Sequence, residues 1–165
     1  MYVIASDGPS AEEWVDLAHE LAPDAFLTLF ARQLFLMSIH DYPRAIDAAH
    51  AALSASGRQS VVLTFLGLSL AESGDATGAR ATYDEMRARA VREYVSPHFM
   101  AALSAALGET GAATAHCHEA FQLRDPGCWV WVSGFPGMHH LKALPEYRRL
   151  VASIGLSGFS TAADG

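Results

Sequence analysis

The hydrophobic pattern of this chain repeats at two spacings, a short one of three to four residues and a long one of 34 residues. Alanine marks the long spacing at Ala11, Ala45, Ala79 and Ala113, and the residues four and seven places after each of these alanines are apolar too. Apolar positions three and four residues apart form one face of a helix. The pattern therefore predicts a helix near each alanine and a structural unit that recurs every 34 residues.

Each of these alanines follows a segment that is typical of a turn between two helices. An acidic residue stands four positions before the alanine, at Asp7, Asp41, Asp75 and Glu109, and glycine precedes the last two acids. Glycine suits such a turn because it adopts a positive φ angle without steric cost. The period divides the chain into a partial unit at 1–25 and full units at 26–59, 60–93 and 94–127.

These units resemble the tetratricopeptide repeat (TPR), a helix-turn-helix unit of the same length. The residues of the middle unit that match its usual columns are Leu66-Gly67, Gly74-Asp75, Ala79 and Tyr83. The other full units depart from the Leu-Gly pair with Arg32-Gln33 and Met100-Ala101, and His40 replaces the turn glycine. The resemblance implies an all-α fold, a right-handed α-solenoid of antiparallel helix pairs.

The partial unit at 1–25 supplies only the end of a first helix, with Tyr2 on its aromatic column, and then a second helix. An incomplete end of a repeat array leaves apolar surface uncovered. We expect either that the chain continues a longer array or that a partner, such as a second copy, covers this end.

The segment after residue 127 is rich in tryptophan and proline and predicts a cap on the last unit. It resembles the closing segment of the C-terminal TPR modules of bacterial regulatory proteins. The residues that match in order are Arg124-Asp125-Pro126, Trp129, Trp131, Pro136, Leu141, Pro145 and Gly155-Leu156. The resemblance implies a helical cap at 128–157 and hence a single domain at 1–157, and residues 158–165 are predicted to be a flexible tail.

The resemblance also implies which residues would bind a partner, because in this family the first helices of the units line a concave groove. The residues assigned to that groove are almost all apolar: Leu27, Phe30, Leu34, Met37, Val61, Thr64, Phe65, Leu68, His98, Phe99 and Ala102. An equally weighted alternative is that several of them are ordinary core residues between the units. The polar residues with which chaperone-binding members of the family clamp a carboxylate are replaced here. An apolar groove needs a cover, for which we consider three candidates: an amphipathic helix of a partner, a second copy, and the chain's own C-terminal segment.

Two functions fit such a groove. The first is a protein–protein interaction module that binds an amphipathic helix, a peptide or a second copy of the chain, which could also pair through the incomplete N-terminal unit. The alternative is a regulatory domain that senses a hydrophobic small molecule, with Thr64 and His98 as its polar contacts.

Composition and charge limit the partners and the cellular location that we expect for the chain. The formal net charge is −7, and a negative surface repels phosphate backbones, so we expect no nucleic-acid partner. The sequence contains no apolar run of the roughly 18 residues that a membrane span requires, and we expect no membrane association. Two cysteines are too few for a disulfide framework, which favours the reducing cytoplasm.

The sequence offers few candidates for catalytic or metal-binding residues, although the chain has 8 histidines. His116, Cys117 and His118 are consecutive, so on a helix they point to different faces and cannot share an ion. His139 and His140 form a second adjacent pair. Because the motifs of hydrolases, phosphate loops and metal sites are missing, we predict no catalytic residue, no metal, no cofactor and no enzymatic activity.

Overall fold

The computed structural model describes residues 8–130, 135 and 137–155, and every regular element in that part of the chain is a helix. The helices are α1 (Gly8–Leu21), α2 (Phe26–Ser38), α3 (Tyr42–Ser56), α4 (Ser60–Glu72), α5 (Ala76–Ala90), α6 (Pro97–Ala106), α7 (Thr110–Gln122), α8 (Gly127–Val130), α9 (His139–Ala143) and α10 (Pro145–Ser153). The predicted all-α class is therefore confirmed for these residues. Tyr2, Asp7, Trp131, Pro136, Leu156 and the predicted tail at 158–165 lie outside them.

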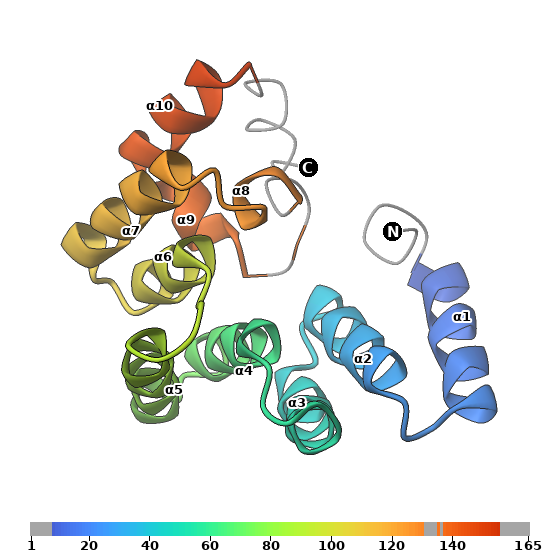
Figure 1. The fold of residues 1–165 in the computed structure, drawn as a ribbon. Coiled ribbons are helices and arrows are strands. Elements are labelled where there is room, and N and C mark those ends of the chain that lie inside the picture. Colours follow the sequence, from blue (N-terminus) through green and yellow to red (C-terminus); the bar gives the residue numbers. More distant parts are fainter. Residues whose placement is uncertain (1–7, 131–134, 136, 156–165) are drawn as a thin grey trace.

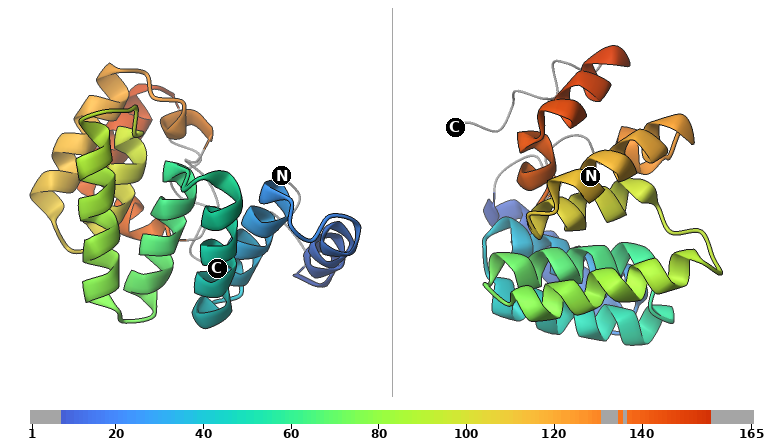
Figure 2. Two further views of the ribbon diagram at one scale, coloured as in Figure 1. Left: turned by 60° about the horizontal axis from the view of Figure 1, so that its bottom comes forward. Right: turned by 90° about the vertical axis from the view of Figure 1, so that its left-hand side faces the viewer.

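The central helices form a curved row of pairs. Helix α2 packs on α3, α4 on α5 and α6 on α7, and α4 also contacts α2 and α6. Figure 1 shows α2, α4 and α6 along the inside of the curve and α3, α5 and α7 along its outside. Helix α1 packs chiefly on α2 at one end of the row, whereas α9 and α10 pack on α6 and α7 at the other end (Figure 2).

The 34-residue spacing of alanine reflects close packing between paired helices. Ala45, Ala79 and Ala113 have no exposed surface, and each lies in the first turn of the second helix of its pair. A side chain no larger than a methyl group lets the neighbouring helix approach at this point. The acidic column has a different role, because Asp75 accepts a hydrogen bond from the backbone amide of Gly78 at 2.8 Å and so caps the start of α5.

At the Leu-Gly column, Gly67 of α4 lies in close contact with a side chain of α6. A Cβ atom placed on Gly67 would lie 2.7 Å from Cδ2 of Leu103. The corresponding residue of α2 is Gln33, which is completely buried. Neither polar atom of the Gln33 amide has a hydrogen-bond partner among the described residues, so this departure from the repeat pattern leaves an unpaired polar group in the core.

The third unit starts later than its sequence register predicts. Helix α6 begins at Pro97 rather than near residue 94, and Ser96 is its N-cap with an extended backbone (φ −56°, ψ 120°). A residue that precedes proline is disfavoured in the helical region, whereas proline itself fits the first helical position. Pro97 therefore delays the start of the helix.

Candidate functional site

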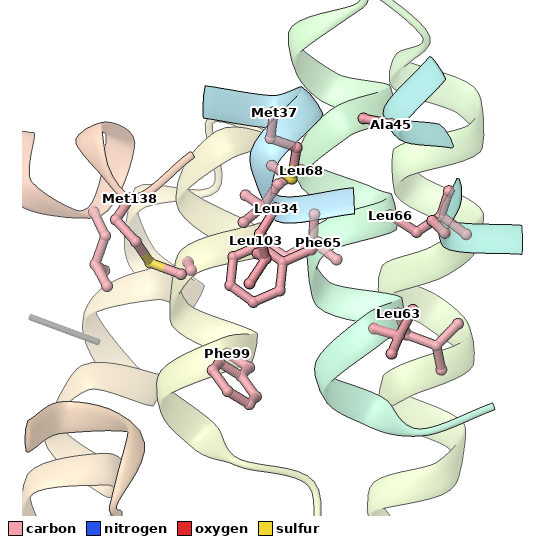
Figure 3. Packing of buried hydrophobic residues seen from close by; sticks show 14 of the residues in the cluster. Leu34, Met37, Ala45, Leu63, Phe65, Leu66, Leu68, Phe99, Leu103 and Met138 are labelled. Carbon is pink, nitrogen blue, oxygen red and sulfur yellow. The ribbon is translucent and has the colours of Figure 1, made fainter. Parts of the chain in front are cut away.

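The C-terminal segment of the chain packs against part of the concave surface that is predicted to bind a partner. The ring of Phe135 lies 6.2 Å from that of Phe65, centroid to centroid. Gly137 passes so close to Leu68 that a Cβ atom on it would lie 3.0 Å from Cδ1 of Leu68. Figure 3 shows Met138 reaching from this segment towards the same cluster. At Phe65 and Leu68, therefore, the chain's own C-terminal segment is the cover that lies in contact.

Most of the predicted groove residues lie inside the chain. Leu27 is 72% exposed, and Phe30 and Val61 are half-buried. The buried ones are Leu34, Met37, Thr64, Phe65, Leu68, His98, Phe99 and Ala102. Their role in binding stays a prediction, and a partner could contact Phe65 and Leu68 only by displacing the C-terminal segment.

The two polar residues proposed as small-molecule contacts are also buried. The Thr64 hydroxyl donates a hydrogen bond to the carbonyl oxygen of Ser60 at 3.0 Å. The centroid of the His98 ring lies 6.2 Å from that of Phe99 and 6.0 Å from that of Tyr147. Burial lowers the pKa of His98 to about 4, although the charge of Asp125 opposes the shift. His98 is therefore a neutral core residue.

Exposed apolar side chains gather instead on the first two helices. On α1, Trp14 is 63% exposed, Leu17 43% and Leu21 78%, and the exposed Leu27 follows at the start of α2. Residues 14, 17 and 21 share one face of a helix, whereas Ala11 and Val15 on another face are buried. The helical spacing of the exposed stripe is visible in the sequence, but the repeat pattern assigns this helix only to an incomplete unit and does not mark it as a binding surface.

Acidic residues border this apolar stripe. Glu13 and Glu20 lie four residues before and three residues after Leu17, on the same side of the helix. The exposed acids of this end of the chain are Glu12, Glu13, Asp16, Glu20 and Asp24. The stripe therefore has a negatively charged border.

The side chains of His116, Cys117 and His118 point to different surroundings, as expected for consecutive residues of a helix. The imidazole of His116 lies 3.1 Å from the hydroxyl of Tyr83, and that of His118 lies 3.0 Å from a carboxylate oxygen of Glu146. Cys117 is buried, and burial raises the pKa of its thiol to about 12. This raised pKa keeps the thiol protonated and unreactive at neutral pH.

A second group of histidines is brought together with a distant carboxylate. His139 and His140, at the start of α9, each place Nε2 close to Oε1 of Glu72, the last residue of α4, at 3.2 and 2.9 Å. The sequence pattern does not predict this cluster, because Glu72 is separated from the histidines by most of two units and no motif spacing links them.

In comparisons with known proteins, no family model, no curated protein and no solved structure matches the chain. Among the described helices, none combines the length and the apolar character needed to cross a membrane.

Proposed function

We propose that this protein is a protein-interaction module of the tetratricopeptide-repeat type, which binds a basic amphipathic helix on the apolar face of α1 and the first turn of α2. The observation that carries the proposal is the exposed stripe of Trp14, Leu17 and Leu21 on α1, together with the exposed Leu27 at the start of α2. Contiguous exposed apolar residues with a polar border are typical of protein-binding surfaces. Burial of such a side chain contributes about 1.5–3 kcal/mol before the costs of association.

The repeat type is supported by the alanine column, which is buried in each of the three central pairs, and by the 34-residue spacing of that column. In a row of helix pairs, each unit buries its apolar face against the next. A partner helix that packs on α1 would extend this row by one helix. The proposed contact therefore repeats a type of packing that the chain already makes internally.

Charge favours a basic partner over a second copy. Two copies that met through this face would bring two acidic borders together, and like charges across an interface oppose association. A helix with lysine or arginine beside its apolar stripe would instead complement Glu13 and Glu20. The alternative hypothesis, a small-molecule sensor, has less support because Thr64 and His98 are buried.

The proposal can be tested with two designed helical peptides that share a leucine stripe. One carries lysine beside the stripe and the other carries glutamate. We expect the lysine peptide to bind the full chain at least about tenfold more tightly, in fluorescence anisotropy at low salt, and the difference to shrink as salt screens the charges. Leu21→Glu should weaken binding at least about tenfold, because it places a charge in the apolar contact.

Val91→Glu is the matched control, because Val91 is 84% exposed but lies after α5, away from the proposed surface. It should bind the peptide like the wild type. Equal binding of both peptides, or unchanged binding by Leu21→Glu, would contradict the proposal. A dimer in sedimentation that Leu21→Glu dissociates would assign the surface to a second copy instead.

A further inference from the structure

The cluster of Glu72, His139 and His140 has the composition and the geometry of a metal site. One ligand atom from each residue lies within 4.8 Å of the other two. Both imidazole Nε2 atoms approach the same carboxylate oxygen, and the two rings lie 4.0 Å apart, centroid to centroid. Two imidazoles and one carboxylate are a frequent ligand set for zinc and for other divalent transition metals.

The distances suit an ion without a large rearrangement. Zinc binds imidazole nitrogen and carboxylate oxygen at about 2.0–2.2 Å, so two neighbouring ligand atoms of a tetrahedral site are about 3.3 Å apart. The observed nitrogen-to-oxygen separations of 3.2 and 2.9 Å are close to this value. Modest separation of the three side chains would open a position for an ion between them.

We propose that Glu72, His139 and His140 bind a divalent transition-metal ion of the zinc class, with water as a further ligand. Glu72 ends α4, in the middle of the row, and the two histidines begin α9, in the segment that packs against part of the concave surface. The ion would therefore fasten the C-terminal segment to the second helix pair. This inference is independent of the proposed helix-binding surface, which lies on α1 and α2.

The competing account is a pair of hydrogen bonds in which each imidazole donates its Nε2 proton to Glu72. That account also explains the short distances, and the nearby charge of Lys142 acts against a bound cation at this place. The two accounts differ in what happens when metal is added, because hydrogen-bonded imidazoles alone do not produce saturable binding at one ion per chain.

The test uses the full chain without a histidine tag, stripped of metal with a chelator and titrated with zinc in a calorimeter. We expect one zinc ion per chain. Glu72→Gln and His140→Gln should each weaken zinc affinity at least about tenfold, because each removes one of three ligands. Glu72→Gln keeps a hydrogen-bond acceptor beside the histidines, so it preserves the fold if the cluster is only hydrogen-bonded.

His118→Gln is the matched control, because it removes an imidazole that also contacts a carboxylate, Glu146 at 3.0 Å, but has no second imidazole in the group. It should leave zinc affinity unchanged. Cobalt offers a readout that needs no variant, since its visible absorption reports the geometry and the nitrogen and oxygen ligands of the site. Zinc should also slow amide hydrogen exchange in α9.

Failure to observe saturable binding, or equal zinc affinity of wild type, Glu72→Gln and His140→Gln, would overturn the site. Tight binding that leaves hydrogen exchange in α9 unchanged would overturn its fastening role. Neither result affects the peptide experiment on α1, so the two proposals fail separately.

Discussion

His98 should make the stability of this protein depend on pH in a defined window. The residue belongs to α6, is 1% exposed and lies close to the aromatic rings of Phe99 and Tyr147. Burial lowers its pKa from 6.5 to about 4. Its Nε2 atom has no hydrogen-bond partner in the described part of the chain, so no hydrogen bond at that atom compensates a charge on the ring.

The expected magnitude follows from the difference in pKa between the unfolded and the folded chain. One pH unit of difference corresponds to about 1.4 kcal/mol, so the lowering of the pKa of His98 is worth about 3 kcal/mol. Above pH 6.5 the residue is neutral in both states. As the pH falls from 6.5 to about 4, the unfolded chain binds a proton that the folded protein excludes, and the free energy of unfolding decreases. Below about pH 4 both states bind the proton, so the loss is complete.

The measurement is urea denaturation between pH 7.5 and pH 4, followed by circular dichroism, for the wild type and two variants. His98→Asn removes the titrating group and should flatten the pH profile by about 3 kcal/mol relative to the wild type. His50→Asn is the control, because His50 is exposed on α3, and its profile should run parallel to the wild type. If the profiles of the wild type and His98→Asn are also parallel, the burial argument is wrong.

Two further predictions concern the core. Gly67→Ala should lower the free energy of unfolding by about 1–3 kcal/mol, because its methyl group would overlap Leu103, whereas Gly111→Ala, on a helix with open space around it, should raise the value by up to about 1 kcal/mol. Thermal denaturation of both variants checks this contrast, which disappears if α4 and α6 can move apart freely. Gln33→Met should raise the free energy of unfolding by about 1–2 kcal/mol, because it replaces an unpaired buried amide with an apolar chain of similar length; a lower melting temperature would show that the amide has a partner such as water.

The helices and their spacing could be predicted from the sequence because they depend on local patterns. The buried alanines, such as Ala79, recur at a fixed interval, and Asp75 caps the helix that it precedes. The late start of α6 was also encoded locally, in Pro97, but the repeat register concealed it. Local rules of this kind act over a few residues and are readable without knowledge of the tertiary structure.

The candidate sites were harder to predict because they depend on contacts between distant segments. The burial of Phe65 results partly from the return of the C-terminal segment, which brings Phe135 against it. The same return brings His140 to Glu72. Whether such a segment folds back depends on the total packing energy of many side chains, which cannot be read from the sequence pattern. The helical spacing of the apolar stripe on α1 can be seen in the sequence. Its exposure was not predicted, because the repeat register favours the first helices of the full units as the binding surface.

The packing of α1 chiefly on one neighbour has a consequence for how any partner would bind. A helix that packs chiefly on one neighbour opens more readily than the central helices, because fewer buried contacts among the described residues oppose its detachment. A ligand that binds only the docked form of α1 would therefore also hold that helix in place. Binding of the partner and docking of α1 would then be coupled equilibria. A substitution in the contact between α1 and α2 would change the affinity for the partner even though the substituted residue does not contact the partner.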